Sequence, residues 1–218
     1  MKKGIIILSG GGDINQTFCL DEKFFSLLSS HSRILYIPTA MDLTLFQAES
    51  CYHWFSSLIS MHVKNDKEVD FTMLNESDLI PDLNLFNSIY LGGGNTYKLL
   101  EYIINNGLDK KIREFILNGG IVYGGSAGAM ILGKDIRTFE HENDKNYINC
   151  QGLNLLKDAS ISCHYSDIKD EELLIVANKI KSNILALPEE SGIIFDGVGD
   201  IIEKVGDVFS FDTIKTKL

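Results

Sequence analysis

Short apolar runs alternate with segments of helical periodicity along most of the chain. The runs are rich in Ile, Val, Leu or aromatic residues and are bounded by Gly, Pro, Asn or Asp, which is typical of buried strands. Strands are therefore predicted at residues 4–8, 34–37, 69–74, 88–91, 121–123, 184–187, 192–195 and 207–211.

Three helices are predicted between these strands. An apolar stripe with a repeat near 3.6 residues runs through residues 46–62. A second helix around residues 99–104 stops at Asn105-Asn106-Gly107, and a third around 112–116 stops at Asn118-Gly119-Gly120, both plausible C-terminal signals. Strands that are apolar on both faces and alternate with helices imply an α/β fold, with a mostly parallel sheet flanked by helices.

The last thirty residues have a different pattern, with short apolar runs between glycines. Gly192, Gly197, Gly199 and Gly206 suggest antiparallel hairpins that finish the sheet. The polar segment 140–146 is typical of an exposed loop, and the chain has neither an internal repeat nor a Pro/Ser-rich linker. We expect a single domain over residues 1–218.

Composition narrows the function classes. The 218 residues include 20 Lys and Arg against 30 Asp and Glu, a formal net charge of −10, which argues against nucleic acid as a partner. No apolar run approaches the roughly 18 residues of a membrane helix, and the first run is too short for export, so a cytoplasmic protein is expected. The four cysteines form no CxxC pair and the histidines show no ligand spacing, so we expect no metal and no cofactor.

The strongest local motif is G-x-S-x-G at Gly124, Ser126 and Gly128. It lies between a predicted buried strand and an apolar helical run, which is the context of a nucleophile elbow. In such a turn the serine Oγ is exposed above the sheet, and the amide of Ala127 at a helix N-terminus can stabilise an oxyanion. The alternative is a tight glycine turn with a surface serine.

A second glycine loop, Gly92-Gly93-Gly94-Asn95-Thr96, follows the strand at 88–91. Its backbone N–H groups can bind a phosphate, a carboxylate or a reaction oxyanion. It is neither a Walker A loop nor a dinucleotide fingerprint, and the loop at residues 9–13 fails both tests as well. Each loop can also be a simple strand-to-helix turn, which is the favoured interpretation for residues 9–13.

A serine nucleophile needs a base, and His164 is the favoured one. It ends a strand-like run after the elbow helix, and such strand ends face the edge where α/β sheets place their sites. The orienting acid stays open at this point: Glu189 and Glu190 follow another predicted strand, whereas Glu140 and Asp144 lie between the serine and the histidine.

The second glycine loop, the serine motif and the segment around His164, in that order along the chain, resemble the aspartyl dipeptidase (peptidase E) family of serine peptidases. The cyanophycinases belong to the same wider group. Matching segments also occur at residues 37–40, 136–138, 152–155 and 187–189. The resemblance implies a three-layer, flavodoxin-like fold, similar to class I glutamine amidotransferases with Ser in place of their Cys, and hydrolysis of a small peptide through an acyl-enzyme. The motifs that carry it are Gly92-Gly93-Gly94-Asn95-Thr96, Gly125-Ser126-Ala127-Gly128-Ala129 and Cys163-His164-Tyr165.

Carried over by position, the resemblance makes Ser126 the nucleophile, His164 the general base and Glu189 the acid. The oxyanion and substrate-binding residues would be Gly93, Gly94, Asn95 and Ala127. No metal or cofactor is implied. The partner would be a small peptide substrate, and the protein would be a monomer or homodimer.

The chain departs from the aspartyl dipeptidases after His164. Those enzymes carry a longer, Arg-containing segment that recognises the substrate aspartate, whereas residues 167–172 here are short and acidic. A strict preference for N-terminal Asp is therefore not implied. The alternative from another class is a non-catalytic domain that binds a small carboxylate or phosphate; an amidotransferase is disfavoured because the elbow has no Cys.

Overall fold

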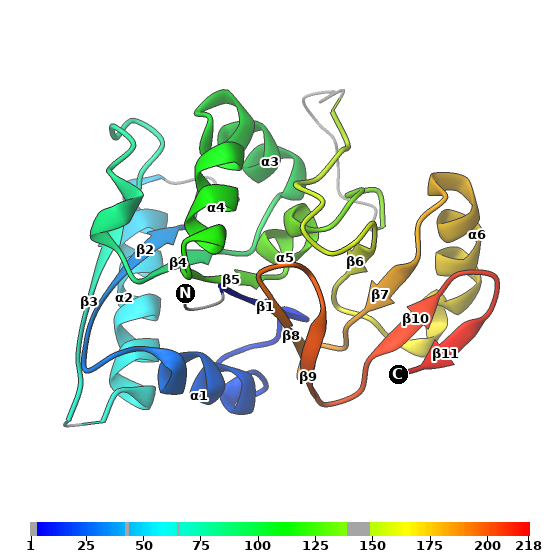
Figure 1. Ribbon diagram of the computed structural model, residues 1–218, viewed down its shortest axis with the longest axis horizontal. Coiled ribbons are helices and arrows are strands. Elements are labelled where there is room, and N and C mark those ends of the chain that lie inside the picture. Colours follow the sequence, from blue (N-terminus) through cyan, green and yellow to red (C-terminus); the bar gives the residue numbers. More distant parts are fainter. Residues whose placement is uncertain (1–3, 42–43, 65, 139–148) are drawn as a thin grey trace.

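A seven-stranded mixed sheet lies at the centre of the molecule, in the order β3–β2–β4–β5–β1–β8–β9 (Figure 1). The computed structural model describes residues 4–41, 44–64, 66–138 and 149–218. The first five strands of that order are parallel, and β8 and β9 are antiparallel to their neighbours. The predicted, mostly parallel sheet is confirmed. Its strands are β1 (Ile5–Ser9), β2 (His31–Ile37), β3 (Glu68–Met73), β4 (Ser88–Leu91), β5 (Ile121–Gly125), β8 (Gly192–Asp196) and β9 (Ile201–Val205).

Helices cover both faces of this sheet, because neighbouring residues of each central strand point to opposite sides. Ile6 and Leu8 of β1 belong to the core under α3, α4 and α5, whereas Ile7 belongs to the core under α1 and α2 (Figure 1). The result is the expected three-layer arrangement. The helices are α1 (Phe18–Leu27), α2 (Leu45–His62), α3 (Thr96–Asn105), α4 (Leu108–Leu117) and α5 (Ala127–Leu132).

The three predicted helices correspond to α2, α3 and α4, while α1 was not predicted. Gly107, at the predicted end of the second helix, has a φ of 63° and separates α3 from α4. Within the described residues no helix is long and apolar enough to cross a membrane.

A second, four-stranded sheet lies beside the first, in the order β11–β10–β7–β6, and α6 (Asp170–Ile180) packs on it (Figure 1). The expectation that residues 184–187 and 207–211 belong to the main sheet is therefore wrong. Ile184, Ala186 and Phe211 join Tyr165 and α6 in a separate apolar core, whereas Leu185, Leu187 and Val208 belong to a core of the main sheet. The strands are β6 (Ser160–Ser162), β7 (Ile184–Ala186), β10 (Phe209–Phe211) and β11 (Lys215–Lys217).

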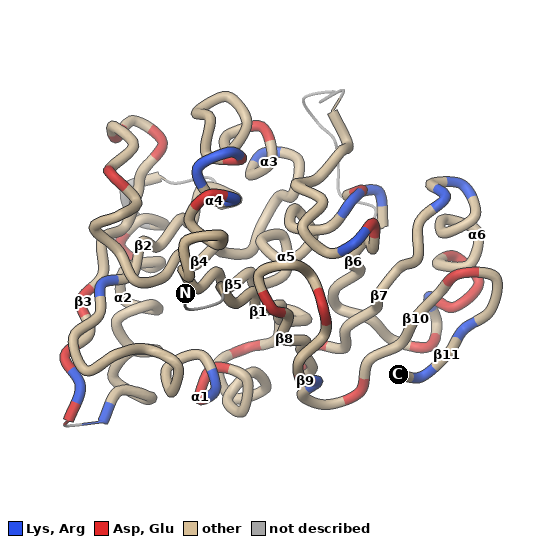
Figure 2. The backbone as a smooth tube through the Cα atoms, in the orientation of Figure 1, with Lys and Arg blue, Asp and Glu red and all other residues tan. Residues whose placement is uncertain are grey.

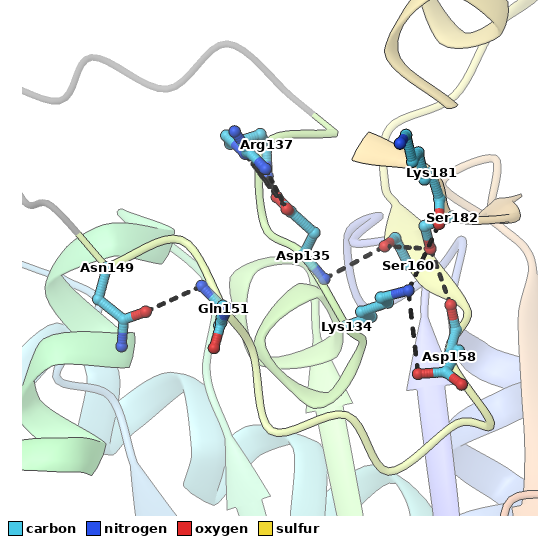
Figure 3. Close-up of polar contacts among 9 residues, drawn as sticks. All are labelled: Lys134, Asp135, Arg137, Asn149, Gln151, Asp158, Ser160, Lys181 and Ser182. Atoms are coloured by element: carbon cyan, nitrogen blue, oxygen red, sulfur yellow. Dashed lines mark hydrogen bonds and ion pairs between the residues drawn. The ribbon is translucent and has the colours of Figure 1, made fainter. Parts of the chain in front are cut away.

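Polar contacts attach the small sheet to the segment that leaves α5 (Figure 3). The N–H of Asp135 donates to Ser160 Oγ at 3.2 Å, and Ser160 Oγ lies 2.8 Å from Ser182 Oγ. Arg137 forms an ion pair with Asp135. Because Ser160 begins β6, these bonds fix the strand that leads to His164.

The middle of the main sheet carries no charge: β4, β5 and β1 contain neither acidic nor basic residues (Figure 2). One carboxyl, Asp21 of α1, is nevertheless buried against it. The hydroxyls of Tyr123 and Thr17 each donate to Asp21 at 2.6 Å. Burial raises the pKa of Asp21 to about 6, although both hydrogen bonds act in the opposite direction.

We expect Asp21→Asn to reduce the pH dependence of stability. A carboxyl whose pKa is raised on folding stabilises the fold at low pH, and that contribution is lost as pH rises through about 6, for a total of about 3 kcal/mol. Asparagine can keep both hydroxyl contacts without a charge. In urea unfolding between about pH 4 and pH 8, the free energy of unfolding of Asp21→Asn should increase relative to that of the wild type as pH rises. Asp70→Asn, on the exposed side of β3, is the control. If the free energies of unfolding of Asp21→Asn and the wild type differed by the same amount at every pH, the raised pKa of Asp21 would be contradicted.

Candidate active site

Ser126 lies on a sharp turn from β5 into α5. Its backbone φ is 49° and ψ is −111°, a conformation that non-glycine residues rarely adopt. Its N–H donates to the carbonyl of Ser9 at 3.2 Å. A Cβ on Gly128 would lie 2.3 Å from the Leu91 carbonyl oxygen, so only glycine lets α5 approach β4 this closely. The turn thus presents Ser126 at the carboxyl edge of the parallel strands.

His164 reaches Ser126 from the end of β6. Its ring nitrogen Nε2 lies 2.8 Å from Ser126 Oγ, and its backbone N–H donates to the carbonyl of Gly10 at 2.9 Å. The preceding residue, Cys163, is fully buried, and burial raises its pKa to about 12. The thiol is therefore protonated at neutral pH and is not a competing nucleophile.

Glu189 completes a hydrogen-bonded chain. His164 Nδ1 lies 3.1 Å from Glu189 Oε1, and the side-chain amide of Gln16 donates to Glu189 Oε2 at 2.9 Å. These bonds, first that of Gln16 and then that of His164, hold the pKa of Glu189 below its usual value. The carboxylate is thus ionised and favours the tautomer in which Nδ1 carries the proton and Nε2 accepts from Ser126.

Of the other acids considered, Glu190 is exposed, and Glu189 is the one in contact with His164. Glu140 and Asp144 lie outside the described residues. Gln16 was not predicted; its position shortly after the first glycine loop was the only signal for it.

That first loop packs directly against the serine and histidine. Gly11 has a φ of 98°, and a Cβ built on it would lie 2.7 Å from both Ser126 Cβ and His164 Cε1. The N–H of Gly12 donates to the Glu189 carbonyl at 3.1 Å. The favoured interpretation of residues 9–13 as a simple turn therefore understated their role, because the loop borders the side chains of Ser126 and His164 and the backbone of Glu189.

The second glycine loop divides into two parts. A Cβ on Gly93 would lie 3.3 Å from Ser126 Cβ, so its backbone is adjacent to the serine. Gly94, with a φ of 131°, packs against Ala40 instead, and the Asn95 side chain caps α3 by accepting from the Lys98 N–H at 3.0 Å. Substrate contact by Gly94 or Asn95 stays a prediction. The oxyanion role of Ala127 also stays a prediction; this residue begins α5, and its N–H has no acceptor within the helix.

A pocket of about 350 Å³ opens beside Ser126. It lies between the carboxyl edge of the main sheet and α2. Both glycine loops contribute backbone to it, and aromatic side chains form much of its wall. The lining residues are Ser9, Gly11, Gly12, Thr17, Tyr36, Met41, Gln47, Ser50, Cys51, Trp54, Tyr90, Gly92, Gly93, Gly125 and Ser126.

The acidic segment after His164 faces the small sheet. The Tyr165 hydroxyl donates to Asp170 at 2.6 Å, and Lys215 Nζ contacts Asp167 at 2.8 Å and Asp170 at 2.9 Å. Lys169 Nζ donates to the His164 carbonyl at 2.7 Å. In the part of the chain that the structure describes, no group of three or more His, Cys, Asp or Glu side chains is placed to hold a metal ion.

Comparisons with known proteins identify relatives of this chain. The model of peptidase family S51 matches residues 5–201. An alignment of 133 residues, which covers 59% of this chain, is 34% identical to the uncharacterized peptidase YgaJ of Bacillus subtilis. An alignment of 115 residues, which covers 46% of this chain, is 31% identical to peptidase E of Escherichia coli. These matches span 55% and 48% of the two relatives, or about half of their length.

Two solved structures share the fold. One is a putative peptidase E from Listeria monocytogenes, with a TM-score of 0.68 and 23% identity over 99% of both chains. The other is a peptidase from an acI-B1 actinobacterium, with a TM-score of 0.75 and 20% identity over 99% of this chain and 94% of that one. The resemblance noted from the motifs is confirmed, and the chain belongs to peptidase family S51.

Proposed function

We propose that this chain is a serine hydrolase that cleaves a small peptide amide through an acyl-enzyme on Ser126. The observation that carries the proposal is the unbroken hydrogen-bonded chain from Ser126 through His164 to Glu189, beside an open pocket. A chain of nucleophile, base and orienting group is the arrangement that activates a serine hydroxyl near neutral pH.

In the acylation step Ser126 Oγ attacks the substrate carbonyl carbon while His164 Nε2 takes the hydroxyl proton. Negative charge develops on the carbonyl oxygen, and the N–H groups of Gly93 and Ala127 are our candidates to stabilise it. The carbon–nitrogen bond then breaks as His164 returns the proton to the leaving amine. Glu189 stabilises the imidazolium that exists between the two transfers.

Deacylation repeats these roles with water. His164 takes a proton from the water that attacks the ester carbonyl, and the proton passes to Ser126 Oγ as the ester bond breaks. The products are a carboxylic acid and the free enzyme, so no cofactor enters the balance.

Hydrolysis of a dipeptide panel tests the proposal. Free amine release with saturation kinetics is expected, and a p-nitrophenyl ester should give a burst of p-nitrophenol equivalent to the enzyme present, since acyl-enzyme accumulates. Binding of dipeptides without turnover, together with no burst, would favour a non-catalytic binding domain instead.

A methyl group at Gly11 should impair turnover. Gly11→Ala meets an unfavourable φ of 98° and clashes with Ser126 and His164, so we expect kcat/KM to fall about 10- to 100-fold. Gly107→Ala is the matched control: it meets a positive φ of 63° but has nothing within 4 Å of the new Cβ. Equal kcat/KM in the two variants would contradict the packing of Gly11 against the reacting pair.

A further inference from the structure

The pocket beside Ser126 has a chemical character that the family relationship does not specify. Tyr36 and Tyr90 form its inner wall, with ring centroids 5.8 Å apart, and Trp54 of α2 lies within 6.1 Å of both rings. Met41 and Cys51 extend the apolar surface. Its volume of about 350 Å³ lies within the range of small-ligand sites.

None of the residues that line this pocket in the described part of the chain is charged. The polar side-chain groups of the lining are uncharged hydroxyl, amide, indole and thiol groups, contributed by Ser9, Thr17, Tyr36, Gln47, Ser50, Cys51, Trp54, Tyr90 and Ser126. A carboxylate moved from water into such surroundings loses hydration without gaining a cation, which costs several kcal/mol. An aromatic or large aliphatic side chain instead gains from burial and from contact with the rings.

The position of the pocket indicates which part of the substrate it accepts. His164 gives its proton to the leaving amine, so the leaving group lies on the histidine side of Ser126. On the histidine side the lining has only the backbone of Gly11 and Gly12, since neither His164 nor Glu189 lines the pocket. On the other side it includes Gly93 and Tyr90, whose hydroxyl comes within 3.6 Å of a Cβ built on Gly125. The pocket therefore extends from the acyl side of the scissile bond.

We propose that this pocket selects substrates whose acyl-side residue is aromatic or large and apolar, and disfavours an acidic one. The inference rests on the proposed function, because it assigns the side chain that accompanies the carbonyl attacked by Ser126. Under this proposal, the uncharged lining of the pocket makes the substrate preference of this chain differ from that of an aspartate-directed peptidase.

Covalent probes can test the preference for an apolar acyl-side residue separately from the reactivity of Ser126. Two diphenyl α-aminoalkylphosphonates are compared, one with a benzyl and one with a carboxymethyl side chain. Ser126 Oγ bonds to phosphorus, one phosphorus–phenoxide bond breaks, and the serine proton passes through His164 to the phenoxide, which leaves as phenol. A small ethyl fluorophosphonate without a side chain reports the reactivity of Ser126 alone.

We expect the benzyl probe to label the wild type at least about tenfold faster than the carboxymethyl probe. Ser50→Arg puts a cation on the pocket rim from an exposed position of α2, and should lower this ratio about tenfold. Ser57→Arg, exposed on the same helix but outside the pocket, is the matched control and should keep the wild-type ratio.

Each other result overturns the inference in a recognisable way. Equal rates for the two probes, or a faster carboxymethyl probe, would refute apolar selection while fluorophosphonate labelling leaves the proposed function standing. The same ratio in Ser50→Arg and Ser57→Arg would refute selection by this pocket. Absence of labelling by all three probes would refute the proposed function, and the inference with it.

Discussion

Ser126→Ala should lower turnover of any peptide substrate by a factor of about 10⁴ or more. The substitution removes Oγ, the atom that we propose forms the acyl-enzyme and that lies 2.8 Å from His164 Nε2. Alanine is smaller and leaves the contacts of the neighbouring glycines unchanged, so the fold should survive. Steady-state hydrolysis with thermal unfolding of the same sample checks both statements.

Ser57→Ala provides the matched control for this loss. It deletes a hydroxyl from an exposed position of α2, outside the pocket, and should leave kcat/KM within about twofold of the wild type. If Ser126→Ala retained more than about a tenth of wild-type turnover, a nucleophilic role for Ser126 would be untenable.

The second large effect is expected for Glu189→Gln. The amide keeps a similar shape but loses the charge that stabilises the imidazolium, and it no longer enforces the Nδ1-protonated tautomer of His164. We expect kcat to fall about 10²-fold or more. The loss should be smaller than for a fully buried triad acid, because the Glu189 side chain is 47% exposed and water screens its charge.

Glu190→Gln is the matched control for Glu189→Gln, since it makes the same change one residue away on an exposed side chain. It should keep near-wild-type kcat. Comparable losses in the two variants would show that the effect arises from general electrostatics, and near-wild-type rates in both would refute a triad that includes Glu189.

Features formed by consecutive residues could be predicted from the sequence. At the Ser126 turn and at the Gly93 loop, the strand, the glycines and the helix follow one another directly, so they could be predicted together. His164 could be predicted because a serine nucleophile needs a base and few histidines end a strand. Choosing Glu189 over Glu190 from the residues alone was not possible, because one position decides which carboxylate reaches His164 Nδ1.

Features that depend on long-range packing were not predicted. Gln16 reaches Glu189 from a loop 173 residues earlier in the sequence, and no periodic pattern records that contact. Trp54 lies in the predicted helix of residues 46–62, but its position next to Tyr36 and Tyr90 depends on how α2 packs on the sheet. The three-residue strands β6 and β7 are too short for their pattern to show that they form a second sheet.

The most direct test of a nucleophilic Ser126 is covalent labelling of the intact protein by a fluorophosphonate, followed by mass spectrometry of its peptides. We expect one added phosphonyl group, with loss of fluoride, located on Ser126 and absent from Ser126→Ala. An unlabelled wild type, or a label that persists in Ser126→Ala, would contradict the claim that Ser126 is an activated nucleophile.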